Sequence, residues 1–89
     1  MIGINKINLK LKIDLENLKN NESIIIKSYK KDRVIDIKKI SNKFEVNENG
    51  FKNVIYTFNE YKYCYKEVIK IIKHEFPNSS MLWYSIRNS

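Results

Sequence analysis

Four lysines recur at helical spacing in the second half of the chain: Lys62, Lys66, Lys70 and Lys73. Positions at i, i+4, i+8 and i+11 lie on one side of an α-helix, so the four ammonium groups would project together. Only Glu67 is close enough in the sequence to offset their charge. We call these four residues the lysine ridge. Such a face is often simply the solvated side of a helix, but it is also suited to binding phosphate through point charges.

A second basic group, Lys30-Lys31-Asp32-Arg33, lies in a predicted turn. The whole chain has 17 basic and 10 acidic residues, a net charge of +7. It has no Ala and no Gln, which is typical of A/T-rich coding sequences and explains part of the lysine content. The remaining excess of positive charge favours a polyanionic partner.

These two groups predict a small non-enzymatic module that binds the phosphate backbone of DNA or RNA. Lysine dominates over arginine, and arginine is the residue that reads guanine edges, so we expect little base specificity. Tyr63, which flanks the ridge, could stack on a base or bond a phosphate. The predicted nucleic-acid-binding residues are Lys62, Lys66, Lys70, Lys73, Tyr63, Lys30, Lys31 and Arg33.

Residues that could perform catalysis or bind metal are sparse. His74 and Cys64 are the only histidine and cysteine, and they lie almost three turns apart on one predicted helix, too far to act as a base and a nucleophile. We interpret Cys64 as a buried thiol and His74 as a residue near the helix C-terminus, where positive charge suits the helix dipole. One His and one Cys are also too few for a structural zinc site.

The carboxylates show no close pair within an apolar segment, the arrangement that separates acid and base roles. Gly3 and Gly50 are isolated, so no glycine-rich phosphate-binding loop is present. The sequence therefore predicts no enzyme activity, no metal and no cofactor.

Trp83 supports an alternative function. It alternates with Leu82, Tyr84 and Ile86 in a predicted strand and so faces the other way. If no helix covers that face, Trp83 would be an exposed aromatic residue at a protein contact. The alternative is thus a protein-binding accessory or inhibitory factor that targets a nucleic-acid-handling complex, and the edge of this strand could also form a homodimer.

The order of the predicted helices and strands indicates an α+β fold in a single domain, 1–89. A helix from Asn59 to Phe76 buries a stripe and ends before Pro77. Thr57 and Glu60 have capping-box spacing, and Asn59 is a competing cap. A mostly antiparallel sheet of four to six strands packs against this helix. The expected stripe comprises Tyr61, Cys64, Tyr65, Val68, Ile69, Ile72 and Phe76.

The N-terminal segment supports two assignments. Ile7, Leu9, Leu11 and Ile13 alternate strictly, which favours a strand followed by a short helical turn from Asp14 to Leu18. A helix with Ile7 and Leu11 inside is the alternative, but it places Leu9 and Ile13 on the wrong face.

Later segments predict strands at 23–30, 34–38, 44–46, 51–58 and 81–86. Asn49-Gly50 is the clearest turn, because both residues tolerate a positive φ. Either register of this hairpin places Phe44, Val46, Phe51 and Ile55 on one face, with Val54, Tyr56 and Phe58 on the other.

From Asp14 to Phe76 the predicted order is helix, three or four strands, helix, which resembles the outline of double-stranded RNA-binding domains. The basic motif that begins the last helix of that family is replaced here by Asn59-Glu60-Tyr61. The chain is also similar in size, charge and composition to accessory proteins of phages and plasmids from low-GC bacteria. With one cysteine and no apolar run of ~20 residues, we expect a cytoplasmic protein that does not enter membranes.

Overall fold

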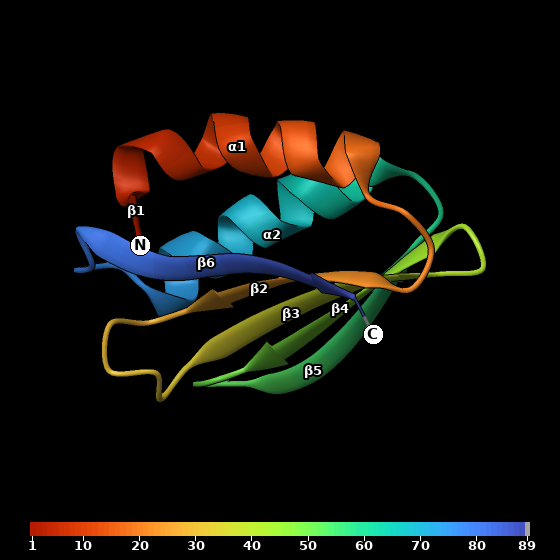
Figure 1. Ribbon diagram of the computed structural model, residues 1–89. Helices are drawn as coiled ribbons and strands as arrows, with labels where there is room; N and C mark the ends of the chain where they lie inside the picture. The colour runs from red at the N-terminus through yellow and green to blue at the C-terminus, as the bar shows by residue number, and fades with distance from the viewer. Residues whose placement is uncertain (89) are drawn as a thin grey trace.

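The computed structural model describes residues 1–88 as two helices on one sheet, and the predicted α+β class is confirmed. Figure 1 shows both helices on the same face of the sheet, with the opposite face uncovered. In chain order the elements are β1 (Ile2–Gly3), α1 (Ile4–Asn17), β2 (Glu22–Lys27), β3 (Val34–Ile40), β4 (Lys43–Asn49), β5 (Asn53–Phe58), α2 (Tyr61–Glu75) and β6 (Met81–Asn88). Neither helix of the described residues is long and apolar enough to cross a membrane.

The strands are ordered β1-β6-β2-β3-β4-β5, and every neighbouring pair is antiparallel. The C-terminal strand β6 therefore lies between β1 and β2. Because β1 pairs only with Met81 and Leu82, the outer edge of β6 beyond Leu82 has no strand beside it within residues 1–88.

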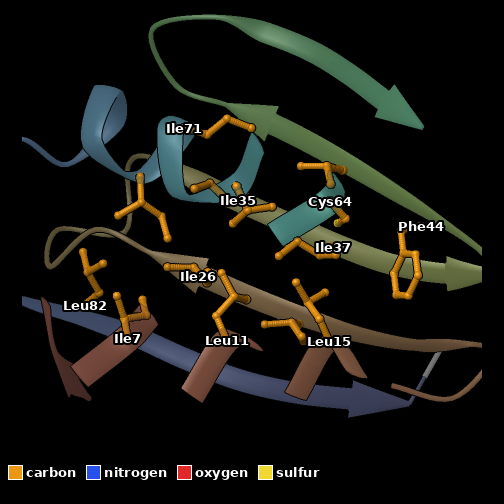
Figure 2. Close-up of a cluster of buried hydrophobic side chains, with 14 of the residues drawn as sticks. Ile7, Leu11, Leu15, Ile26, Ile35, Ile37, Phe44, Cys64, Ile71 and Leu82 are labelled. Carbon is orange, nitrogen blue, oxygen red and sulfur yellow. The ribbon is translucent and has the colours of Figure 1, made fainter. Parts of the chain in front are cut away.

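The core forms between the helices and the inward-facing side chains of the strands (Figure 2). Side chains alternate between the two faces of a strand, so Ile24 and Ile26 on β2 and Ile35 and Ile37 on β3 all face the helices and are fully buried. Leu82 on β6 is also fully buried, whereas its neighbour Trp83 faces the open side. The alternation predicted for the last strand is confirmed.

The N-terminal segment forms a helix, so the strand predicted from Ile7 to Ile13 is wrong. Helix α1 buries Ile7, Leu11 and Leu15 and leaves Leu9 67% and Ile13 49% exposed. The helical turn predicted after Asp14 is the last turn of this longer helix.

The width of the sheet explains this outcome. Six strands at ~4.8 Å spacing make a sheet roughly 24 Å wide, whereas one helix covers about 10 Å. A second helix is needed to cover the β6 and β2 side of the sheet. The burial gained there outweighs the exposure of two apolar side chains.

The β4–β5 hairpin also differs from the prediction. Phe44 and Val46 are buried, but Phe51 is 62% and Ile55 61% exposed, so the predicted common face is wrong. The register pairs Asn49 with Asn53, which leaves a three-residue connection over 50–52 and turns Val54, Tyr56 and Phe58 toward the helices.

Positive φ angles occur at a different turn from the one predicted. Gly50 has no positive φ, and neither does Asn49. Ser41 and Asn42, which join β3 to β4, have φ values of 51° and 65°. Two positive φ angles at the centre of a two-residue loop match the right-handed twist of the paired strands.

Helix α2 ends before Pro77 as predicted, with Phe76 as its C-cap residue. It begins at Tyr61 and has no side-chain hydrogen bond at its N-cap, so the capping box does not form. Its buried face includes Cys64, Val68 and Ile72 of the predicted stripe. Ile71 and Glu75 are also buried, and neither was predicted to be.

Candidate functional site

The lysine ridge lies on the solvent side of α2. All four of its lysines are exposed, opposite the buried Cys64, Val68 and Ile72. Within residues 1–88 the one ion pair joins Lys10 to Asp14 at 3.2 Å, so no ridge lysine is paired with a carboxylate. Tyr63 is 57% exposed beside the ridge. The ridge therefore presents four unpaired ammonium groups on one rigid element.

In the basic turn between β2 and β3, Arg33 contacts helix α2 and Phe51, whereas the two lysines do not. The Nη1 group of Arg33 donates a hydrogen bond of 2.6 Å to the carbonyl of Glu75, and its guanidinium lies 3.7 Å from the centre of the Phe51 ring. Arg33 thus holds the C-terminal end of α2 against the sheet. Lys30 is exposed, and the ammonium of Lys31 lies 4.7 Å from the centre of the Trp83 ring.

This geometry separates Lys31 from the ridge. The ridge lysines lie on the face of α2 opposite its buried residues, whereas Lys31 lies over the ring of Trp83, which faces the open side of the sheet. Lys31 therefore does not extend the surface of the ridge.

Trp83 is half-buried in the open face. Its indole N–H donates to the carbonyl of Tyr29 at 3.0 Å. Beside it is a hollow of about 160 Å³, whose lining includes Lys27, Lys31 and Arg87. The register that pairs Lys27 with Trp83 places them side by side, which the sequence did not indicate because the pairing of β2 with β6 is non-local.

A cluster of two carboxylates and an imidazole lies where α2 meets β4. Glu48 and Glu75 are only 2% and 1% exposed, and His74 beside them is exposed. The expectation that no carboxylates pair within an apolar setting is therefore wrong. Strand parity turns Glu48 inward after Phe44 and Val46, and the helical stripe turns Glu75 inward to meet it.

Glu75 is held by the backbone of the β4–β5 connection. Its carboxylate accepts hydrogen bonds from the N–H of Phe51 at 3.0 and 3.1 Å and from that of Lys52 at 3.5 Å. A Cβ atom on Gly50 would lie 2.0 Å from Oε1 of Glu75, so the approach requires glycine. This close approach, rather than a positive φ, explains Gly50.

The two carboxyl groups differ in their electrostatics. Burial, the hydrogen bond with Glu75 and the charge of Glu75 raise the pKa of Glu48 to about 7. Burial also acts to raise the pKa of Glu75, but hydrogen bonds from Glu48, Phe51 and Lys52 outweigh it and lower that pKa. Tyr56 donates its hydroxyl to Oε1 of Glu48 at 3.2 Å, while Oε2 of Glu48 is buried and accepts no hydrogen bond from any described residue.

Cys64 is fully buried, and burial raises the pKa of its thiol to about 12. A thiol that stays protonated is a poor nucleophile and a poor ligand. The interpretation of Cys64 as a packed core residue is confirmed.

Comparison of the chain with protein-family models, curated proteins and solved structures gives no match. The similarity to double-stranded RNA-binding domains rests on element order alone.

Proposed function

We propose that this protein is a small nucleic-acid-binding module that contacts phosphates through the lysine ridge. The observation that supports it is the exposure of four like charges on one face of α2, none of them paired with a carboxylate within residues 1–88. Helix geometry holds these charges in a row, so binding would not require the backbone to rearrange. Duplex DNA offers one negative charge per ~1.7 Å of its axis, so a row of ammonium groups meets several phosphates.

The test is a variant in which all four ridge lysines are changed to glutamine. Each phosphate contact contributes roughly −0.9 to the slope of log affinity against log salt on duplex DNA, so the variant should flatten that slope by about 3–4. Parent and variant would be titrated against duplex and single-stranded oligonucleotides of DNA and RNA at several salt concentrations. The loss of affinity should be nearly the same for every oligonucleotide sequence, because lysine contacts phosphate as a point charge and does not distinguish bases.

A matched control removes the same charge elsewhere, by changing the exposed Lys6, Lys19, Lys43 and Lys52 to glutamine. This control should keep most of the salt slope of the parent. Equal slopes in both quadruple variants, or no binding by the parent at low salt, would rule out the ridge as the binding surface.

The open face of the sheet favours a second candidate, a protein-binding function. Trp83 and the exposed Ile55 and Met81 lie there among side chains of both charges, the acidic Asp36 and Glu45 and the basic Lys27, Lys38 and Arg87. Exposed apolar residues surrounded by charges of both signs are typical of a protein-binding surface. The observation that favours it is that neither helix covers this face (Figure 1). If the parent protein binds no oligonucleotide, the protein-binding function is the candidate that remains.

A further inference from the structure

The paired carboxylates of Glu48 and Glu75 lack a cationic partner of their own. Both residues are at least 98% buried, and no lysine or arginine forms an ion pair with either among the described residues. Buried charges in proteins are usually paired with an opposite charge or coordinate a metal ion. Two inward-facing carboxyl groups are therefore an unusual feature of so small a core.

The three side chains are arranged as a set of metal ligands. One ligand atom each from Glu48, His74 and Glu75 lies within 4.8 Å of the others. Carboxylate oxygens and an imidazole nitrogen bind Zn²⁺ at about 2.0–2.2 Å, so three ligands around one ion lie a little over 3 Å apart. Small side-chain adjustments would bring this set to that spacing.

A second group of contacts orients these ligands. Tyr56 donates to Oε1 of Glu48 and no described residue donates to Oε2, while Phe51 and Lys52 donate to the carboxylate of Glu75 through their backbone N–H groups. Hydrogen bonds of this kind fix the orientation of metal-binding carboxylates. The buried Oε2 atom of Glu48 accepts no hydrogen bond from any described residue, so either a proton shared with Glu75 or a bound cation must satisfy it.

We propose that Glu48, His74 and Glu75 form a binding site for one divalent transition-metal ion, with Zn²⁺ as the representative. Two carboxylates would balance its double charge, and one imidazole favours a transition metal over Mg²⁺ or Ca²⁺. Glu48 and His74 also line a hollow of about 240 Å³, from which water or another ligand could reach a fourth position. The metal site and the lysine ridge share no ligand residue, although Lys70 of the ridge also lines this hollow, and the proposed metal binding does not depend on nucleic-acid binding.

A shared proton is the competing explanation, in which a protonated Glu48 donates to Glu75 and no metal binds. Glu48→Gln distinguishes the two, because its amide can still donate to Glu75 and preserve the fold but is a far weaker metal ligand. His74→Gln gives an independent variant on the exposed side of the cluster, where folding depends little on the imidazole.

The experiment is calorimetric titration of Zn²⁺ into the parent and variants after treatment with a chelator, with the visible spectrum of Co²⁺ as a second readout. The parent should bind one equivalent, and Glu48→Gln and His74→Gln should each weaken binding about tenfold or more. Glu16→Gln is the matched control, since Glu16 is an exposed carboxylate on α1 outside both the cluster and its hollow and should leave affinity unchanged. No uptake by the parent, or an affinity in both cluster variants equal to that of the parent, would overturn the proposal. If Glu48→Gln fails to fold, the Zn²⁺ affinity of His74→Gln alone decides whether the cluster binds the metal.

Discussion

At the scale of single residues, the approach of Glu75 to Gly50 leaves no room for a side chain at position 50. The carboxylate occupies the space where a side chain on Gly50 would begin, 2.0 Å from the nearest oxygen and 2.7 Å from the carboxyl carbon. It accepts hydrogen bonds there from backbone N–H groups of the β4–β5 connection. The loop and the end of α2 are therefore linked through one buried side chain.

Gly50→Ala should destabilise the protein by about 1–3 kcal/mol, because the displaced carboxylate leaves buried hydrogen-bonding groups unsatisfied. Backbone strain is not the cause, since Gly50 has no positive φ. Urea unfolding of parent and variant measures the difference in the free energy of unfolding.

The same substitution in a Glu75→Ala background is the control. With the carboxylate removed, alanine at position 50 should cost less than ~0.5 kcal/mol, and the two changes should be strongly non-additive. An equal cost in both backgrounds would show that the contact with Glu75 is not the reason for glycine.

At the scale of elements, α1 shows how packing selects between two periodic patterns. Its apolar residues satisfy a period of two and also a helical period, and only the helical one places Ile7, Leu11 and Leu15 over the sheet. Leu9 and Ile13 remain on the outside, where they contribute little to the core.

Leu11→Ala should cost ~2–5 kcal/mol because it leaves a cavity in the core, whereas Leu9→Ala should change stability by less than ~0.5 kcal/mol. Thermal and urea unfolding of the two variants provide the measurement. A strand would place both leucines on the same face, so similar costs would contradict the helix.

At the scale of the whole molecule, β6 connects parts of the chain that are far apart in sequence. It pairs with β1 and β2, Tyr84 donates its hydroxyl to Asp14 of α1 at 2.7 Å, and Trp83 bonds the β2–β3 loop at Tyr29. Leu82 adds a fully buried side chain. The last strand thus closes the core beneath the first helix.

A chain that ends at Ser80 should lose its cooperative unfolding transition, because it exposes Ile24 and Ile26 and leaves the backbone of β2 unpaired along one edge. Circular dichroism during heating would measure this loss. Addition of a peptide spanning residues 81–89 should restore part of the transition. A truncated chain that unfolds as sharply as the parent would show that β6 is dispensable.

The sequence by itself determined the elements whose signals are local. The lysine and apolar spacing of α2, its end before Pro77, the β-branched run at Ile24–Ile26 and the alternation from Leu82 to Ile86 depend on neighbouring residues only. The same reasoning placed the ridge lysines on one exposed face, because helix geometry alone decides that arrangement.

Only the tertiary structure decided the features that depend on distant partners. The helical form of α1 required a wide sheet to cover, and the exposure of Phe51 and Ile55 followed from the register between β4 and β5. The Glu48–Glu75 cluster brings together residues from a strand and a helix that are 27 positions apart in the sequence. Local periodicity describes which way a side chain points along its own element, but the element it meets there is chosen by the packing of the whole core.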